Sequence, residues 1–168
     1  MLLRLNEPYF HVVVGAETEF IEFLKYRQVT YKSTVVSNLI KGDSCKTTND
    51  FYDEFSRVLQ FPDYFGYNLS AFDECLNDLE WIEADGYGLF VSNAHLLLVD
   101  NAKVLEAVIK LLHNAAREWA NGREFDEFGT PPTPFHIFLH CPIENQKEIR
   151  LRLNKAGVSE VEVEKIVL

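Results

Sequence analysis

The chain has 168 residues, 47% apolar and 13% aromatic, which is too rich in core-forming side chains for a disordered protein. Its formal net charge of −10 argues against direct binding of nucleic acid, because phosphate backbones select for Lys and Arg. No apolar run approaches the roughly 20 residues that a membrane span requires. Three cysteines without framework spacing, and an N-terminus too short in apolar residues for a signal peptide, indicate reduced thiols and a cytoplasmic protein.

Apolar periodicity predicts strands that alternate with helices along the chain. The expected strands are Tyr9–Val14, Ser33–Ile40, Tyr87–Ser92, Phe135–Cys141 and Val158–Val167. The expected helices are Thr18–Tyr26, Thr48–Leu59, Leu69–Glu80, Asp100–Trp119 and Glu144–Ala156, with a loop at Gly122–Pro134. Because strands that are separated by helices pair in parallel, this order predicts an α/β fold, a small parallel sheet flanked by helices.

Nearly all of the net charge lies in one quarter of the chain, residues 43–85. This segment holds eleven Asp or Glu residues against Lys46 and Arg57, a net charge of −9. A one-sided field of this kind attracts a basic partner. Acidic helix faces are also common as plain solvated surfaces, so charge alone does not establish a binding site.

Residues 61–79 join an aromatic loop to an amphipathic helix. Asn68 is expected to cap the helix, and Gly66 to adopt a positive φ in the loop. So short a loop cannot bury all its aromatic rings, so some are expected at the surface. The stripe expected to be buried at helical spacing is Leu69, Phe72, Leu76 and Leu79. The residues expected on the solvent side are Ser70, Asp73, Glu74, Asn77 and Asp78.

This loop and helix resemble those of the barstar-related family of ribonuclease inhibitors. The residues that match the family pattern are Pro62, Tyr64, Phe65, Gly66, Asn68 and Leu69, then Ala71, Glu74, Cys75 and Leu76. The resemblance implies a barstar-like core at residues 33–141, because the strand, two helices, strand, helix, strand order of that portion matches. Residues 1–32 and 142–168 lie outside it. We expect both flanks to extend the sheet or cover its edges, within a single domain of residues 1–168.

The resemblance also implies a partner-binding face. Tyr64 matches an aromatic position of that face, and Glu74 keeps the acid expected to matter most. Ser70 lacks an acid of the family pattern and Asp73 replaces an aromatic residue, so the target is expected to differ from the familiar nuclease. The expected partner-binding residues are Tyr64, Phe65, Tyr67, Asn68, Ser70, Asp73, Glu74, Asn77, Asp78 and, by a loose match, Glu118.

Two functions are compatible with this face. The first is a cytoplasmic immunity protein that blocks the active site of a basic ribonuclease toxin. The second is a non-inhibitory binding module of the same fold for another basic protein. Neither requires a metal or a cofactor.

Catalysis is not expected from these residues. His140 and Cys141 are neighbours on a strand, so their side chains point to opposite faces. His136 and His140 share a face but lie about 13 Å apart, too far for one zinc ion. Asp73 and Glu74 diverge by about 100° around their helix, so they do not form an acid–base pair.

Overall fold

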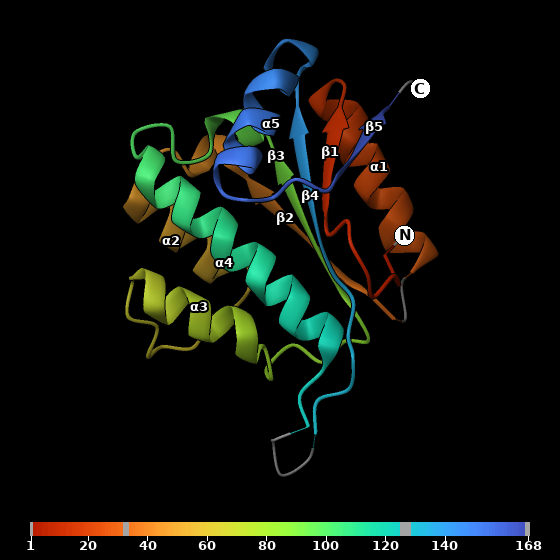
Figure 1. Ribbon diagram of the computed structural model, residues 1–168, viewed down its shortest axis with the longest axis vertical. Helices are drawn as coiled ribbons and strands as arrows, with labels where there is room; N and C mark the ends of the chain where they lie inside the picture. The colour runs from red at the N-terminus through yellow and green to blue at the C-terminus, as the bar shows by residue number, and fades with distance from the viewer. Residues whose placement is uncertain (1, 32–33, 125–128, 167–168) are drawn as a thin grey trace.

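A computed structural model describes residues 2–31, 34–124 and 129–166 of the chain. Its centre is a sheet of five parallel strands in the order β2-β3-β4-β1-β5 (Figure 1). The strands are β1 (Phe10–Val14), β2 (Val36–Lys41), β3 (Tyr87–Ser92), β4 (Phe135–Cys141) and β5 (Val161–Lys165). The predicted α/β fold with a parallel sheet is confirmed.

Helices cover both faces of the sheet. Figure 1 shows α1 on one face, and α2, α3, α4 and α5 on the other. The helices are α1 (Glu17–Thr30), α2 (Thr48–Val58), α3 (Leu69–Asp78), α4 (Ala102–Asn121) and α5 (Gln146–Lys155). Short 3₁₀ turns lie at Gly42–Ser44, Ala94–Leu96 and Ile143–Asn145.

The two flanks of the chain extend the sheet on the same side. β1 pairs with β4, so that Val12 lies opposite Leu139, and β5 pairs with β1, so that Val163 lies opposite Val12. Residues from the N-terminal and the C-terminal flank therefore form the outer two strands together. This confirms the expectation that the flanks add strand and helix elements to the sheet.

The element boundaries differ from the sequence prediction mainly at the ends. α1 runs to Thr30, beyond the predicted end at Tyr26. β2 begins at Val36 instead of Ser33, and β5 covers Val161–Lys165 of the predicted Val158–Val167. Ser33, Val167 and the part of the predicted loop at 125–128 lie outside the described residues.

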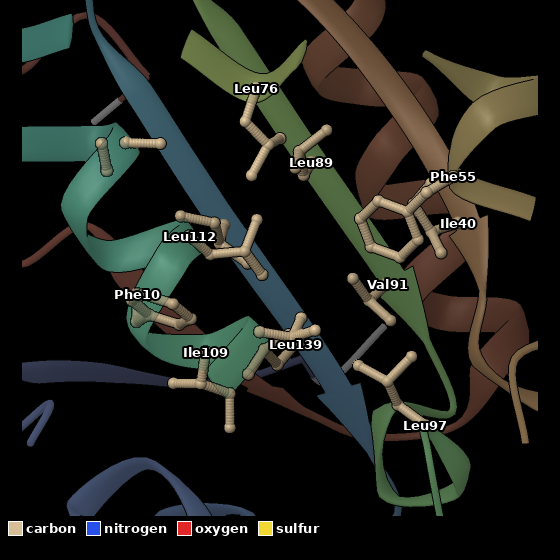
Figure 2. Packing of buried hydrophobic residues seen from close by; sticks show 14 of the residues in the cluster. Phe10, Ile40, Phe55, Leu76, Leu89, Val91, Leu97, Ile109, Leu112 and Leu139 are labelled. Atoms are coloured by element: carbon tan, nitrogen blue, oxygen red, sulfur yellow. The ribbon is translucent and has the colours of Figure 1, made fainter. Parts of the chain in front are cut away.

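The larger core fills the space between the sheet and helices α2 to α5 (Figure 2). One face of β4 contributes Phe135, Ile137, Leu139 and Cys141, as the sequence predicts. On α4 the buried stripe differs from the expected one, because Val104 and Leu111 are only partly buried. The stripe is centred on Leu105, Val108, Ile109 and Leu112 and continues to Trp119.

A smaller core lies on the opposite face of the sheet, beneath α1. Three fully buried histidines border it: His11, His136 and His140. His136 Nε2 donates a hydrogen bond to the Arg4 carbonyl (2.8 Å), so its Nδ1 accepts from His11 Nε2 (3.0 Å). Burial lowers the pKa of all three rings, that of His11 to about 3.

Candidate protein-binding face

The aromatic loop before α3 is a packed unit with two exposed rings. Phe61 and Phe65 are buried, and their ring centroids lie 4.9 Å apart. Phe65 also meets Tyr52 of α2 edge-on at 5.8 Å. Tyr64 and Tyr67, in contrast, are 67% and 52% exposed. The Phe65 ring therefore anchors the loop to the core, and its predicted contact with a partner stays a prediction.

The backbone of the loop turns one residue later than expected. Tyr67 adopts the left-handed conformation, with a φ of 52°, whereas Gly66 does not. Gly66 has a different role, since a Cβ at this position would lie 3.1 Å from Asn68 Nδ2. That amide donates a hydrogen bond to the Gly66 carbonyl at 3.0 Å. Gly66 therefore leaves room for the side chain that begins the helix.

Asn68 caps α3 as the sequence predicts. Its Oδ1 accepts the Ala71 N–H at 2.9 Å, which satisfies one of the free donors of the first turn. Phe72, Cys75 and Leu76 are buried, while Leu69 is only partly so. α3 ends at Asp78, before the predicted Glu80, because Leu79 is buried in the left-handed conformation (φ 47°).

One group of predicted site residues gathers around the exposed Tyr64. Glu74 lies on the solvent side of α3, and Asp78 lies one turn further along. The pKa of Tyr64 is raised, by partial desolvation of its hydroxyl and then by the charges of Asp78 and Glu74. The exposed Tyr64 ring therefore lies within the electrostatic influence of two carboxylates of α3.

A second group links α3 to α4. Asn77 Nδ2 donates to the Asp73 carbonyl (2.9 Å) and to Asp73 Oδ1 (3.1 Å). Arg123 Nη2 donates to Asn77 Oδ1 at 3.2 Å and lies 3.7 Å from Glu118 Oε2. Sequence reasoning missed Arg123, although it follows the predicted end of the long helix closely. Ser70 is exposed in the first turn of α3 and belongs to neither group.

Most acidic residues of segment 43–85 remain accessible to solvent in the folded protein. Glu54 is buried, where it accepts the Lys41 N–H (3.2 Å) and pairs with Arg57 Nη2 (2.7 Å). This pair removes one charge of each sign, so the net charge of −9 in residues 43–85 is unchanged. The other ten acids of the segment are exposed or half-buried and can act on a partner.

The described residues provide no activated thiol and no metal-binding cluster. Cys45, Cys75 and Cys141 are free and buried, and burial raises the pKa of each thiol, to about 12 for Cys45 and about 11 for Cys141. Among residues 2–31, 34–124 and 129–166, no group of His, Cys, Asp or Glu is placed to hold a metal ion. Within those same ranges, no helix combines the length and apolarity needed to cross a bilayer.

The family described as barstar (barnase inhibitor) matches residues 36–139, which is more than half of the chain. The chain belongs to the barstar family. The matched stretch contains β2, β3, most of β4 and helices α2 to α4, with the loop and both groups of site residues. β1, α1, α5 and β5 are additions to this barstar core.

Other comparisons add little to the barstar assignment. Among solved structures, a chain from "Structure of Drosophila ORC bound to AT-rich DNA and Cdc6" is 16% identical, with a TM-score of 0.49. The similarity covers 93% of this chain and 48% of that one, so the protein spans about half of its length. A likeness at this level carries no argument about function. No curated protein matches the chain.

Proposed function

We propose that this barstar-family protein is a cytoplasmic inhibitor that binds a basic ribonuclease, or a related toxin, and covers its active site. The observation that carries this proposal is the exposed Tyr64, which precedes the acidic solvent side of α3 with Glu74 and Asp78, within the stretch that matches the family. The three free, buried cysteines are compatible with a reducing compartment.

The mechanism is steric and electrostatic. Tyr64 lies over the rim of the active site, while the Glu74 and Asp78 carboxylates face the basic side chains that would hold RNA phosphate. Phe65 holds the loop in place from below. The packed loop and the capped helix are ordered before binding, which lowers the entropy cost of association. The −9 segment makes association fast and salt-sensitive.

The partner-binding role is proposed for most residues of the predicted face. Tyr64, Tyr67, Glu74 and Asp78 offer exposed or half-exposed contacts, and Ser70 is open in the first turn of α3. Asn68 acts indirectly as the helix cap. Asp73, Asn77 and Glu118 belong to the bridge between α3 and α4.

Affinity capture from the native organism tests the proposal. The protein is immobilised, basic proteins that bind it are recovered, and each is assayed for RNA cleavage with and without the inhibitor. We expect recovery of a basic nuclease whose activity falls to background at equimolar protein. Recovery of a basic partner without nuclease activity would instead support the non-inhibitory binding module.

Two charge-reversal variants locate the interface. Glu74→Lys should weaken binding at least about 30-fold, as expected when a central charged contact is reversed. Glu160→Lys changes the net charge equally at an exposed position just before β5, outside the barstar core. It should weaken binding by less than about three-fold, through the long-range field alone. Equal effects of the two variants would place the interface elsewhere.

A further inference from the structure

The guanidinium of Arg123 lies between α3 and α4, in contact with side chains of both helices. Its Nη2 donates to Asn77 Oδ1 at 3.2 Å and lies 3.7 Å from Glu118 Oε2. Its guanidinium carbon lies 5.4 Å from the centroid of the Trp119 ring. An amide oxygen, a carboxylate and an aromatic face together suit the planar guanidinium of Arg better than the ammonium of Lys.

The groups that hold this guanidinium are themselves fixed by other contacts. Asn77 is oriented by its two hydrogen bonds to Asp73, in which its Nδ2 is the donor, so its Oδ1 is left to accept. Trp119 is buried, and its Nε1 donates to the Leu76 carbonyl at 2.9 Å. Both residues are therefore oriented by contacts that do not involve Arg123.

The Arg123 side chain is held more weakly than its backbone. Its N–H and carbonyl form a two-bond bridge with Thr130, at 2.8 and 2.9 Å. The side chains of Arg123 and Glu118 are 28% and 56% exposed, so water competes for their contact. A cleft of about 520 Å³, lined in part by Asp78, Glu80 and Arg123, adjoins the site and gives the side chain room to move.

We propose that Arg123 occupies, in the free protein, the place that an arginine side chain of the partner takes on binding. Arg123 thus competes with the partner for this site. A partner that presents a guanidinium to Asn77 and Trp119 displaces Arg123 more readily than one that presents an ammonium. The inference rests on the proposed function, because Asn77, which accepts from Arg123, lies on the same helix as Glu74 and Asp78. It goes further by naming the chemistry of one partner group and the residue that selects for it.

Peptide binding tests this subsite without any nuclease. The probes are tetra-arginine and tetra-lysine peptides with blocked ends, titrated calorimetrically at low salt into the full chain. Arg123→Met removes the cation but keeps an unbranched side chain beside Trp119. It should bind tetra-arginine about five-fold more tightly than the natural chain, which corresponds to roughly 80% occupancy of the site by Arg123. The gain for tetra-lysine should be less than about two-fold.

Arg117→Met is the matched control. Arg117 is exposed on α4 and its Nη2 donates to Asn114 Oδ1, so its removal changes the net charge equally without opening the site. It should alter tetra-arginine affinity by less than about two-fold. Adding Asn77→Ala to Arg123→Met should abolish the gain, because the acceptor is then lost.

Three results would overturn the inference: equal gains for Arg123→Met and Arg117→Met, a gain that persists without Asn77, or equal gains for both peptides. Arg123→Gln provides a second variant, and unchanged thermal unfolding shows that each protein is folded. Failure here would leave the nuclease-capture experiment unaffected. A partner without nuclease activity would in turn leave the peptide result standing.

Discussion

Removing the Phe65 ring tests whether the aromatic loop is anchored as the structure shows. Phe65 is 6% exposed and contacts Phe61 and Tyr52. A buried aromatic side chain covers about 150 Å² or more, worth about 4 kcal/mol at ~25 cal/mol per Å². The site is at the edge of the core and relaxes in part, so Phe65→Ala should cost about 3 kcal/mol, the lower end for such substitutions.

Urea unfolding followed by tryptophan fluorescence measures this loss directly. Trp81 is a local reporter, since its ring meets that of Phe61 edge-on at 6.3 Å. The neighbouring Tyr64→Ala is the control, because Tyr64 is 67% exposed, and its urea midpoint should match that of the natural chain. If Phe65→Ala also left the midpoint unchanged, Phe65 would not anchor the loop. The Phe65 ring would then be available to contact a partner, as the sequence predicts.

Three further predictions concern the elements that position the face. Asn68→Ala should lose about 1 kcal/mol of unfolding free energy with its helix cap, while Asn68→Asp keeps the acceptor and should stay close to the natural chain in the same urea titration. Gly42→Ala should lower the melting temperature measured by circular dichroism, because its Cβ would lie 2.5 Å from the backbone oxygens of Ser92 and Asn93; an unchanged melting temperature would contradict that crowding. Burial holds the folded-state pKa of His11 near 3, whereas the unfolded ring titrates near 6.5. The contribution of His11 to the free energy of unfolding is therefore fully present above about pH 6.5 and is lost as the pH falls. His11 alone should then remove about 2 kcal/mol between pH 7 and pH 5, with His136 and His140 acting in the same direction, and a flat stability profile over that range would refute this sign.

Local sequence patterns were enough to predict much of the candidate protein-binding face. The Asn68 cap and the burial of Phe72, Leu76 and Leu79 depend on neighbours within a few turns of one helix, so periodicity and capping preferences are enough to predict them. The alternation of strands and helices likewise predicted a parallel sheet. The family resemblance supplied the expectation that this segment binds a protein.

Other features depended on contacts between segments far apart in the chain. The four aromatic residues of the loop lie within seven positions of one another, and tertiary packing decides that Phe61 and Phe65 are buried while Tyr64 and Tyr67 are exposed. The position of Arg123 depends on how the turn after α4 places its side chain against α3, 46 residues away from Asn77.

The sequence by itself therefore determined the fold class, the acidic segment and the capped helix, because each follows from short-range spacing or from composition. The tertiary structure decided which rings and charges of that segment are available to a partner. It also decided that the two flanks of the chain meet in β1 and β5 beside β4. The burial of the loop rings and the order of the strands are set by long-range packing, and residue spacing does not encode them directly.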